Sequence, residues 1–337
     1  MGCAPADIGD LVYTSDDDPG IRRKGRARVR YVDDATGSVV RREATLARIA
    51  ALAVPPAWED VWICAEPNGH LQATGRDQRA RKQYRYHTRF RAQREQEKFA
   101  DLVPFGESLG ALRRRIDHDL DGNRGWEADR VLALALALLD RTRIRVGNDC
   151  YAKENGTYGL TTLQNRHVDV QAGAVRFRFV GKGGKRHQVA LDDRRLARLV
   201  RACGSLPGRH LLQYEDDGGE LRPITSDQIN AQLRALTGLD VTAKWFRTWG
   251  ASVEAAARLA EAGEPASARE ARSTVLEAVD EVADLLGNTR TVCRASYVHP
   301  AVPAAYEAGR LADWWQDGPS RAGGGLEADE RRLLVVL

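Results

Sequence analysis

The sequence predicts an α+β protein in which a small β-rich domain precedes a larger, mainly helical domain. Before about residue 90, short segments alternate polar and apolar residues and end in turn sequences, as strands do. Beyond about residue 95, apolar residues recur at helical spacing over longer segments. The length of 337 residues also favours two domains. We therefore expect a β-rich domain over residues 1–90, a helical domain over 91–317 and a C-terminal tail over 318–337.

The first ninety residues contain two strand candidates and one helix candidate. Arg26 to Val32 alternates charged and apolar residues, and the turn sequence 33–37 (Asp-Asp-Ala-Thr-Gly) follows it. Val61 to Ala65 is a second short β-prone segment, closed by Pro-Asn-Gly at 67–69. Between them, Thr45 to Leu52 is predicted to form a short helix.

The second part of the chain has helical patterns interrupted by one hairpin. The clearest helices are expected at Glu127 to Arg141 and at Thr242 to Ala260. The hairpin has one strand at Val175 to Val180, a glycine-rich turn over 181–184 and a returning strand at Arg186 to Leu191. From Gly318 onward, glycine is frequent, and we expect no regular structure until the final Leu-Leu-Val-Val-Leu.

Composition places the chain among ordinary globular proteins. Hydrophobic residues make up 43% and charged residues 29%, outside the range of disordered chains. The longest apolar run, Val131 to Leu139, is too short to cross a bilayer, and the N-terminus lacks an apolar signal stretch. The five cysteines are scattered without a CxxC pair, which favours reduced thiols. These features predict a soluble cytoplasmic protein without a membrane partner.

Charge is distributed unevenly, although the net charge is only +4. Residues 72–94 contain eight basic side chains and one acid, whereas residues 253–286 contain eight acids and three arginines. Clustered Arg and Lys attract backbone phosphates, so the first segment is a candidate polyanion-binding surface. On the charge count alone, a solvated basic face is the favoured interpretation of this segment.

Four familiar motifs are incomplete or absent. Residues 117–122 begin like a calcium loop, but Ala128 occupies the position of the bidentate glutamate, so an ordinary loop before the next helix is expected. The sequence Gly-Lys-Gly-Gly-Lys at 181–185 lacks the spacing and the Ser or Thr of a nucleotide-binding P-loop. Neither HExxH nor Gly-x-Ser-x-Gly occurs. We therefore expect no bound metal, no nucleotide and no other cofactor.

Four segments in the second part carry residues suited to phosphate chemistry. They are Arg143 to Asn148 after the first long helix, Lys182 in the hairpin turn, Lys244 to Trp249, and Leu286 to Pro300. In the third segment, the spacing of Trp245 and Trp249 predicts that they anchor one helix face while Lys244 and Arg247 project from another.

In order and spacing, these segments resemble the type IB DNA topoisomerases, specifically the small poxvirus-like and bacterial form. The matching motifs are Arg-Val-Gly at 145–147, Lys-Glu-Asn at 153–155, Val-Gly-Lys at 180–182, Phe-Arg-Thr-Trp-Gly at 246–250, and a tyrosine nine residues after Asn288. Upstream, Gly-Arg-Asp at 75–77 and Arg-Lys-Gln-Tyr-Arg-Tyr at 81–86 also fit. The resemblance covers roughly residues 10 to 310 and implies the catalytic fold shared by these enzymes and the tyrosine recombinases.

The resemblance implies a DNA topoisomerase that relaxes supercoiled duplex DNA by transient single-strand cleavage. Tyr297 would become joined to the 3′ phosphate, and Lys182 would protonate the departing 5′ oxygen. The nonbridging oxygens would be held by Arg145, Arg247 and Asn288. Poxvirus-type enzymes carry histidine where Asn288 stands; an amide can donate the same neutral hydrogen bond but adds no positive charge. The phosphotyrosine bond conserves the energy of the broken link, so resealing needs neither ATP nor metal.

Physical chemistry supports the same assignment. Displacement at phosphorus concentrates negative charge on equatorial oxygens, and guanidinium groups suit two such oxygens. An alkoxide leaving group needs a proton, which a lysine in a turn can supply. A tyrosine with a pKa of about 10 needs nearby cations to form its phenolate.

The basic segment of the β-rich domain predicts contact with duplex DNA. Glutamine can read adenine in the major groove, and cations can hold phosphates. The resemblance adds two residues near the cleaved phosphate, Tyr151 and Lys244. The expected DNA-binding residues are Arg76, Arg81, Lys82, Gln83, Tyr84, Tyr86, Tyr151 and Lys244. We expect a monomer that closes as a clamp around duplex DNA and associates with the nucleoid.

Two other functions remain open at this stage. A tyrosine recombinase shares the order Arg, Lys, Arg, Tyr, but Lys244 to Phe246 replaces its usual His-x-x-Arg start and the N-terminal domain reads as strands. A noncatalytic DNA-binding protein would use the basic strand alone, which the complete set of catalytic positions disfavours.

Overall fold

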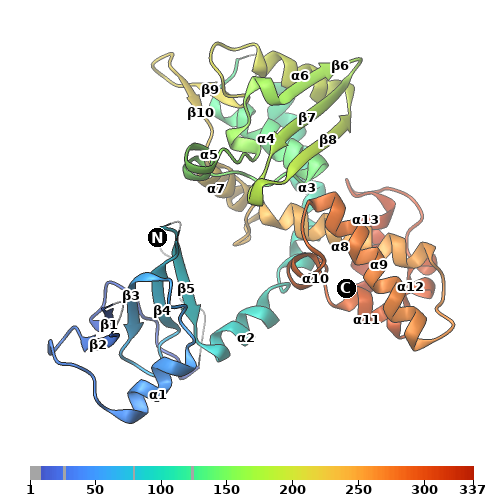
Figure 1. Ribbon diagram of the computed structural model, residues 1–337. Helices are drawn as coiled ribbons and strands as arrows, with labels where there is room; N and C mark the ends of the chain where they lie inside the picture. Colours follow the sequence, from blue (N-terminus) through green and yellow to red (C-terminus); the bar gives the residue numbers. More distant parts are fainter. Residues whose placement is uncertain (1–8, 26–27, 79, 123–124) are drawn as a thin grey trace. The chain divides into compact units, whose positions relative to one another are not determined.

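The computed structural model describes residues 9–25, 28–78, 80–122 and 125–337, which divide into two units, Met1–Lys98 and Phe99–Leu337. The first unit is built on an antiparallel sheet and the second is mainly helical (Figure 1). This arrangement confirms the predicted α+β class. Each unit is described by itself.

The first unit contains a twisted antiparallel sheet and two helices. Among the described residues, the strand order is β2-β1-β3-β4-β5, and α1 lies beside the sheet (Figure 1). The elements are β1 (Gly20–Lys24), β2 (Arg30–Asp33), α1 (Glu43–Ala51), β3 (Glu59–Cys64), β4 (Leu71–Arg76), β5 (Lys82–Tyr86) and α2 (Thr88–Glu97). Consecutive antiparallel pairing from β3 to β5 brings the basic segment to the open edge of the sheet.

The strand boundaries differ from the predicted ones at the start of the chain. The strand expected from residue 26 begins at Arg30, and residues 26–27 lie outside the described residues. β1 was missed because Gly20–Lys24 ends in three charged residues and shows little alternation. It is held as the central partner of β2 and β3, with Ile21 in the small core of this unit. Tertiary packing therefore outweighs local propensity there.

The second unit surrounds one continuous hydrophobic core. Its first half contains α3 (Leu102–Gly122), α4 (Ala128–Thr142), α5 (Asp149–Asn155), η1 (Leu160–Thr162), η2 (Asn165–His167), β6 (Val168–Gln171), β7 (Ala174–Val180), η3 (Lys182–Gly184), β8 (Arg186–Asp192) and α6 (Arg194–Gly204). Its second half contains β9 (Gln213–Glu215), β10 (Leu221–Pro223), α7 (Ser226–Thr237), α8 (Lys244–Glu261), α9 (Ala268–Leu286), α10 (Arg290–Ser296), α11 (Ala301–Glu307), α12 (Leu311–Asp317) and α13 (Ala328–Val336). Helix α4 is at the centre, and most of its side chains from Val131 to Leu139 are buried.

The predicted hairpin is present with the expected faces. Val175, Phe177 and Phe179 of β7 are buried, whereas the intervening arginines are exposed. The strands β7 and β8 pair in an unbroken antiparallel register that places Phe179 opposite His187. A third strand, β6, completes this sheet on the other side of β7. It was not predicted because its four residues are too few to establish a period.

The segment 117–122 is helical, which corrects the expectation of a loop there. It forms the last turns of α3, and its Asp117 and Asp121 carboxylates accept hydrogen bonds from Arg195 at the start of α6. Ile116 and Leu120 continue the buried face of the helix through this segment. Apolar periodicity therefore outweighs the loop-like composition of alternating aspartates.

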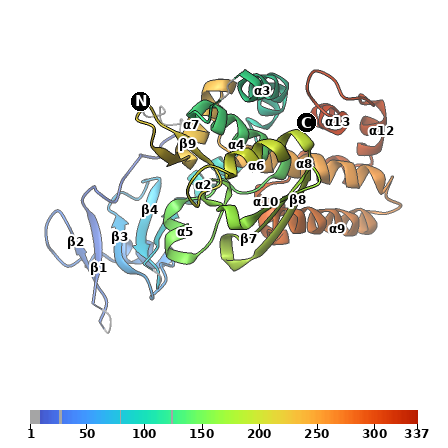
Figure 2. The same ribbon diagram turned by 90° about the horizontal axis from the view of Figure 1, so that it is seen from above.

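Two long helices, α8 and α9, run side by side in both views (Figure 1, Figure 2). Helix α8 contacts α9 as well as α11 and α13, and its Ala255, Ala256 and Leu259 are almost fully inaccessible. Helix α9 ends at Leu286 and is capped by Gly287, which adopts the left-handed conformation with φ 62°. The chain then turns sharply into α10, so the end of α9 and the start of α8 approach the end of α4.

The C-terminal residues are more ordered than the sequence suggested. Helix α13 begins at Ala328, five residues before the final apolar run, and Leu333 and Val336 are buried in the main core. Glu330 explains the early start: its carboxylate accepts a hydrogen bond from the backbone N–H of Glu327 at the helix N-terminus. The glycine-rich stretch before it packs closely, because a Cβ on Gly110 of α3 would lie 2.0 Å from the Gly324 carbonyl oxygen.

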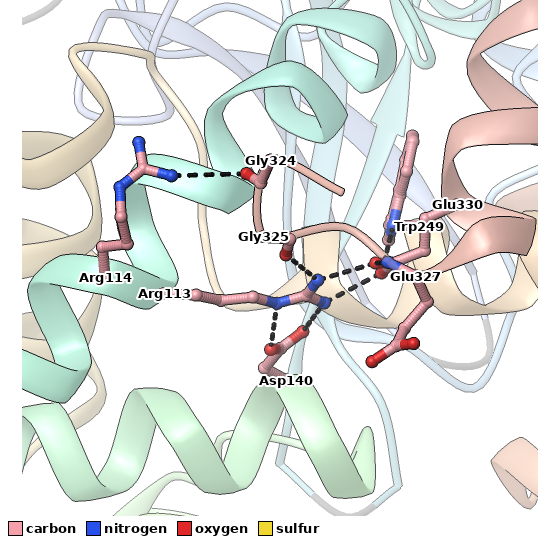
Figure 3. Close-up of polar contacts among 8 residues, drawn as sticks. All are labelled: Arg113, Arg114, Asp140, Trp249, Gly324, Gly325, Glu327 and Glu330. Carbon is pink, nitrogen blue, oxygen red and sulfur yellow. Dashed lines mark hydrogen bonds and ion pairs between the residues drawn. The ribbon is translucent and has the colours of Figure 1, made fainter. Parts of the chain in front are cut away.

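A buried ionic cluster joins this C-terminal helix to the rest of the unit (Figure 3). Arg113 of α3 donates to both carboxylate oxygens of Glu330, at 2.6 and 2.8 Å, and to both of Asp140 on α4, at 2.8 and 2.9 Å. Glu330 also accepts a hydrogen bond of 3.0 Å from the indole N–H of Trp249 on α8. One guanidinium and two carboxylates thus connect α3, α4, α8 and α13.

None of the helices in the described part of the chain is long and apolar enough to cross a lipid bilayer.

Replacing Glu330 by Gln should destabilise the second unit. Removing one charge from a buried pair leaves Arg113 undercompensated, so unfolding in urea should become easier by about 3 kcal/mol. Burial raises the pKa of Glu330, but hydrogen bonds from Arg113 lower it more, so the pKa lies below its usual value. The parent should therefore lose this contribution as the pH falls below about 4.3, and the variant should not.

Asp329→Asn on the same helix is the matched control, because the Asp329–Arg332 pair is partly exposed and should contribute at most about 1 kcal/mol. Equal effects of the two substitutions would contradict a structural role for the cluster.

Candidate active site

The candidate catalytic residues come together in the second unit from five separate segments. One pocket has Arg145, Lys182 and Arg247 in its lining, together with Arg143 and His187. Asn288 is hydrogen-bonded to Arg145, and the ring of Tyr297 lies beside Arg247. The chain brings them together because the ends of α4, α9 and α10 and the start of α8 meet next to the β7–β8 turn.

Arg247 is the most deeply buried cation of the site, with 4% of its surface exposed. Its guanidinium donates to two backbone carbonyls, those of Arg143 and of Leu286, the latter at 2.8 Å. Its Nε is buried without a hydrogen-bond partner among the described residues. Lys244, three residues earlier on α8, is exposed, and both cations lie beside the ring of Tyr297, so they share one side of the helix as the sequence suggested. Trp249 is buried and Trp245 only partly so.

The carbonyl that receives Arg247 is presented by a left-handed residue. Arg143 caps α4 with φ 54°, and its N–H donates to Leu139 O at 2.9 Å. Its side chain lies against Gly250 of α8, where a Cβ would come 2.2 Å from Nε. Two residues later, the backbone of Arg145 is fixed by a hydrogen bond of 2.8 Å from the Leu160 N–H. The turn after α4 therefore orients both arginines.

Asn288 is held by three hydrogen bonds and is 7% exposed. Its N–H donates to Ala283 O at 2.8 Å, its carbonyl oxygen accepts from Lys185 Nζ at 2.9 Å, and its Oδ1 accepts from the Arg145 guanidinium. Because arginine is only a donor, that last bond fixes which end of the amide is the oxygen. The amide Nδ2 is then a buried donor without a partner in the described part of the chain.

Tyr297 follows the last residue of α10 and is partly buried. Its N–H donates to Cys293 O at 2.9 Å, and its carbonyl accepts from the Ser252 hydroxyl of α8 at 3.2 Å. The Arg247 guanidinium lies 5.2 Å, and the Lys244 ammonium 5.6 Å, from the centre of its ring. Burial raises the pKa of the phenol, but the charge and hydrogen bonding of Arg247, with Arg145 and Lys244, lower it further than burial raises it.

The two arginines form a cationic site without internal neutralisation. Among the described residues, neither Arg145 nor Arg247 forms an ion pair with a carboxylate. Burial and the neighbouring charge of Arg145 lower the pKa of Arg247 to about 10. Such a site is electrostatically unfavourable when empty and gains free energy from an anion, so the arrangement suits a phosphate group.

Lys182 lies in the turn between β7 and β8 and is exposed. The turn is closed by a hydrogen bond of 2.8 Å from the Gly181 N–H to Lys185 O. Gly183 and Gly184 have φ near 77° and 76°, the left-handed region that glycine adopts without strain. The sequence therefore builds a tight turn that presents this ammonium at the rim of the arginine pocket.

In the first unit, the predicted DNA-binding residues lie on β4 and β5, except Arg81, which directly precedes β5. Lys82, Tyr84 and Tyr86 occupy one exposed face of β5, and the two tyrosine rings stack with centroids 6.1 Å apart. Gln83 is on the opposite face and donates to Asp77 at 3.0 Å, so it does not share a face with the tyrosines. Arg81 also pairs with Asp77, Lys82 pairs with Asp16 at 2.7 Å, and Arg76 donates to Ala80 O.

Two further residues, Lys244 and Tyr151, were predicted to lie near the cleaved phosphate. Lys244 is the first residue of α8 and lies near Tyr297, as the sequence resemblance implied. Tyr151 belongs to α5, but its side chain lies outside the described residues.

Three residues of the site were not predicted from the sequence: Arg143, Lys185 and His187. The alternation of the hairpin carried a signal for His187, because it places that residue opposite Phe179 and near the turn. No sequence pattern indicated that Arg143 would contribute a backbone carbonyl.

The chain matches two protein families along most of its length. The family of the eukaryotic DNA topoisomerase I catalytic core matches residues 87–308, and the family of the bacterial DNA topoisomerase IB N-terminal domain matches residues 28–77. These matches confirm the resemblance seen in the motifs. The second match covers β2, β3 and β4 of the first unit's sheet, and a match of this part to a topoisomerase domain disfavours the recombinase alternative.

Individual relatives agree. DNA topoisomerase 1B of Acanthamoeba polyphaga mimivirus is 30% identical over 258 residues, which cover 74% of this chain and 76% of the relative. DNA topoisomerase 1B of Vaccinia virus is 29% identical over 137 residues, 39% of this chain and 41% of the relative. DNA topoisomerase 1 beta of Arabidopsis thaliana is 25% identical over 206 residues, 61% of this chain and 22% of the relative.

The phenol of Tyr297 should titrate below the usual pKa of about 10. Its signal is the ultraviolet difference absorbance between the parent and Tyr297→Phe across the alkaline range. Lys244→Met should move the titration upward, because it removes one of the charges that favour the phenolate. Lys24→Met in the first unit is the control and should leave it unchanged. An unchanged or lower value in Lys244→Met would contradict this electrostatic account.

Proposed function

The chain belongs to the type IB DNA topoisomerases, and from that premise we propose that it relaxes supercoiled duplex DNA by cutting and resealing one strand through a phosphotyrosyl intermediate. The observation that carries the proposal is the grouping of Tyr297 with two unneutralised arginines, a buried amide donor and an exposed lysine. In this proposal the second unit is the catalytic domain and the first is a DNA-binding domain.

Tyr297 is the proposed nucleophile. Its phenolate oxygen attacks a backbone phosphorus, a bond forms between that oxygen and phosphorus, and the bond from phosphorus to the 5′ oxygen breaks. The products are a 3′-phosphotyrosyl link and a free 5′ hydroxyl. The lowered pKa of Tyr297 supports this role, because a larger fraction of the phenol is ionised at neutral pH.

Arg145, Arg247 and Asn288 are proposed to hold the two nonbridging oxygens. Negative charge grows on these oxygens in the transition state, and donors fixed in advance stabilise it without reorganisation. The two carbonyls that bind Arg247 and the Arg145–Asn288 bond provide that fixation. The unpartnered Nδ2 of Asn288 is the remaining donor, and it replaces a histidine without adding a titrating group.

Lys182 is proposed to transfer a proton to the departing 5′ oxygen. Its position on a glycine turn at the rim of the arginine pocket suits a donor that must reach a leaving group. In the resealing step, the 5′ hydroxyl returns its proton to the amine and attacks phosphorus, and the tyrosine leaves. This is the reverse of cleavage through the same groups.

Neither ATP nor a metal ion is required in this scheme. The phosphotyrosyl ester retains the energy of the phosphodiester it replaces, so resealing needs no further energy source. Arginine, lysine and amide groups supply the charge stabilisation that metal ions supply in other phosphoryl-transfer sites.

Duplex DNA is the proposed partner of the first unit, and the active species is proposed to be a monomer located at the nucleoid. Tyr84 and Tyr86 present a stacked aromatic surface, and Lys82 lies beside them with its ammonium 5.7 Å from the Tyr84 ring. The same basic segment also contains three other proposed DNA-binding residues, Arg76, Arg81 and Gln83. Asp77 and Asp16 hold these side chains before DNA binds, which reduces the conformational entropy lost on binding.

The experiment that tests this function is relaxation of negatively and positively supercoiled plasmid in EDTA without ATP. The parent should relax both in steps of linking number, and Tyr297→Phe should bind DNA but leave the topology unchanged. Intact topology with the parent, or recombinant products from plasmids with paired sites, would contradict the proposal.

A further inference from the structure

His187 of β8 lies in the lining of the arginine pocket and has no role in the chemistry described above. Its ring stacks on Phe179, its cross-strand partner, with centroids 5.2 Å apart and planes 13° from parallel. Phe179 is itself part of the main core. Phe179 therefore fixes one face of the imidazole ring.

The edges of the imidazole contact two glycines. A Cβ on Gly181 would lie 2.5 Å from His187 Cδ2 and 2.7 Å from Nε2, and a Cβ on Gly287 would lie 2.2 Å from Cε1. Real Cβ atoms do not approach that closely, so both positions must lack a side chain while the ring is there. Gly181 directly precedes Lys182, and Gly287 directly precedes Asn288.

The backbone at Gly181 identifies the ring as the reason for this glycine. Gly181 has φ −99° and ψ −168°, an extended conformation open to any residue. By contrast, Gly287 has φ 62° and would favour glycine in any case. The absence of a side chain at position 181 is thus explained by packing against His187.

The imidazole is a poor candidate for binding phosphate directly. Burial lowers its pKa, and the charges of Arg145, Arg247 and Lys185 lower it further, so the ring is neutral near neutral pH. Its Nε2 is buried against Gly181, and no hydrogen-bond partner for it occurs in the described residues. What remains is a steric function between two backbone segments.

We propose that His187 is a positioning residue whose ring sets the distance between two turns: the β7–β8 turn, which carries Lys182, and the turn from α9 to α10, which carries Asn288. Lys185, which donates to Asn288 O at 2.9 Å, connects the same two turns on the exposed side. The inference rests on the proposed function, in which Lys182 delivers a proton to the leaving oxygen while Asn288 helps to hold the phosphate. Without the ring, the turn can shift relative to the phosphate, and proton transfer is the step that suffers.

The test compares two leaving groups in single-turnover cleavage of a short duplex. One substrate has the normal 5′-bridging oxygen, and the other has sulfur there, which departs without protonation. His187→Ala should slow cleavage of the oxygen substrate by roughly tenfold to a hundredfold, the effect expected of a misplaced acid. On the sulfur substrate it should cleave within about threefold of the parent. His118→Ala, an exposed histidine on α3, is the matched control and should match the parent on both substrates.

A double-mutant cycle tests the packing itself. Gly181→Ala should slow the oxygen substrate, because its methyl group collides with the ring. In the His187→Ala background, the same methyl group has space, so Gly181→Ala should cause no further loss. If the His187→Ala protein fails to fold, the two leaving groups are compared in Gly181→Ala alone, which alters the same contact from the glycine. That variant should be slowed on the oxygen substrate and not on the sulfur substrate.

Lys182→Ala separates failure of this inference from failure of the proposed function. Lys182→Ala should be strongly slowed on oxygen and restored on sulfur; without restoration, Lys182 is not the acid and the proposed function is wrong on that point. If cleavage by Lys182→Ala is restored on the sulfur substrate, two results would overturn the positioning proposal. One is that His187→Ala slows cleavage equally on both substrates or on neither. The other is that the losses of cleavage rate from the Gly181 and His187 substitutions add.

Discussion

Arg247 is buried, and no carboxylate among the described residues pairs with it. Burial of such a cation costs several kcal/mol unless other protein groups accept its hydrogen bonds. Its guanidinium is held by the carbonyl of Arg143, which follows α4, and by the carbonyl of Leu286, which ends α9. The left-handed caps at Arg143 and Gly287 both serve this geometry, because they turn the chain where those carbonyls are needed. The Arg247 anchor therefore joins α4, α8 and α9 into one site.

The ionic cluster around Arg113 supports the same helices away from the pocket. Asp140 lies three residues before Arg143 on α4, and Trp249 lies two residues after Arg247 on α8. Glu330 connects both to the C-terminal helix through Arg113 and the indole N–H. Residues far beyond Tyr297 thus contribute to the rigidity of the segments that hold the arginines, and preorganised cations of this kind stabilise a transition state most effectively.

The sequence predicted what depends on local pattern and on family motifs, and it missed what depends on tertiary packing. The β7–β8 hairpin and helices α4 and α8 could be predicted because their apolar residues repeat at a clear period. β1 and the early start of α13 could not, since they depend on a sheet partner and on Glu330. In the site, motif spacing predicted the grouping of Tyr297, Arg145, Lys182, Arg247 and Asn288. No sequence pattern indicated the hydrogen bond to the Arg143 carbonyl or the packing of the His187 ring against two glycines.

The central claim is that Tyr297 attacks a phosphate held by Arg145, Arg247 and Asn288. The most direct measurement traps the covalent complex with a short duplex, digests the protein and sequences the DNA-linked peptide by mass spectrometry. The account predicts a single phosphodiester link between the Tyr297 phenol and the 3′ end of the cut strand, formed with EDTA present. Attachment to another residue or to a 5′ end, or the lack of any adduct, would contradict it.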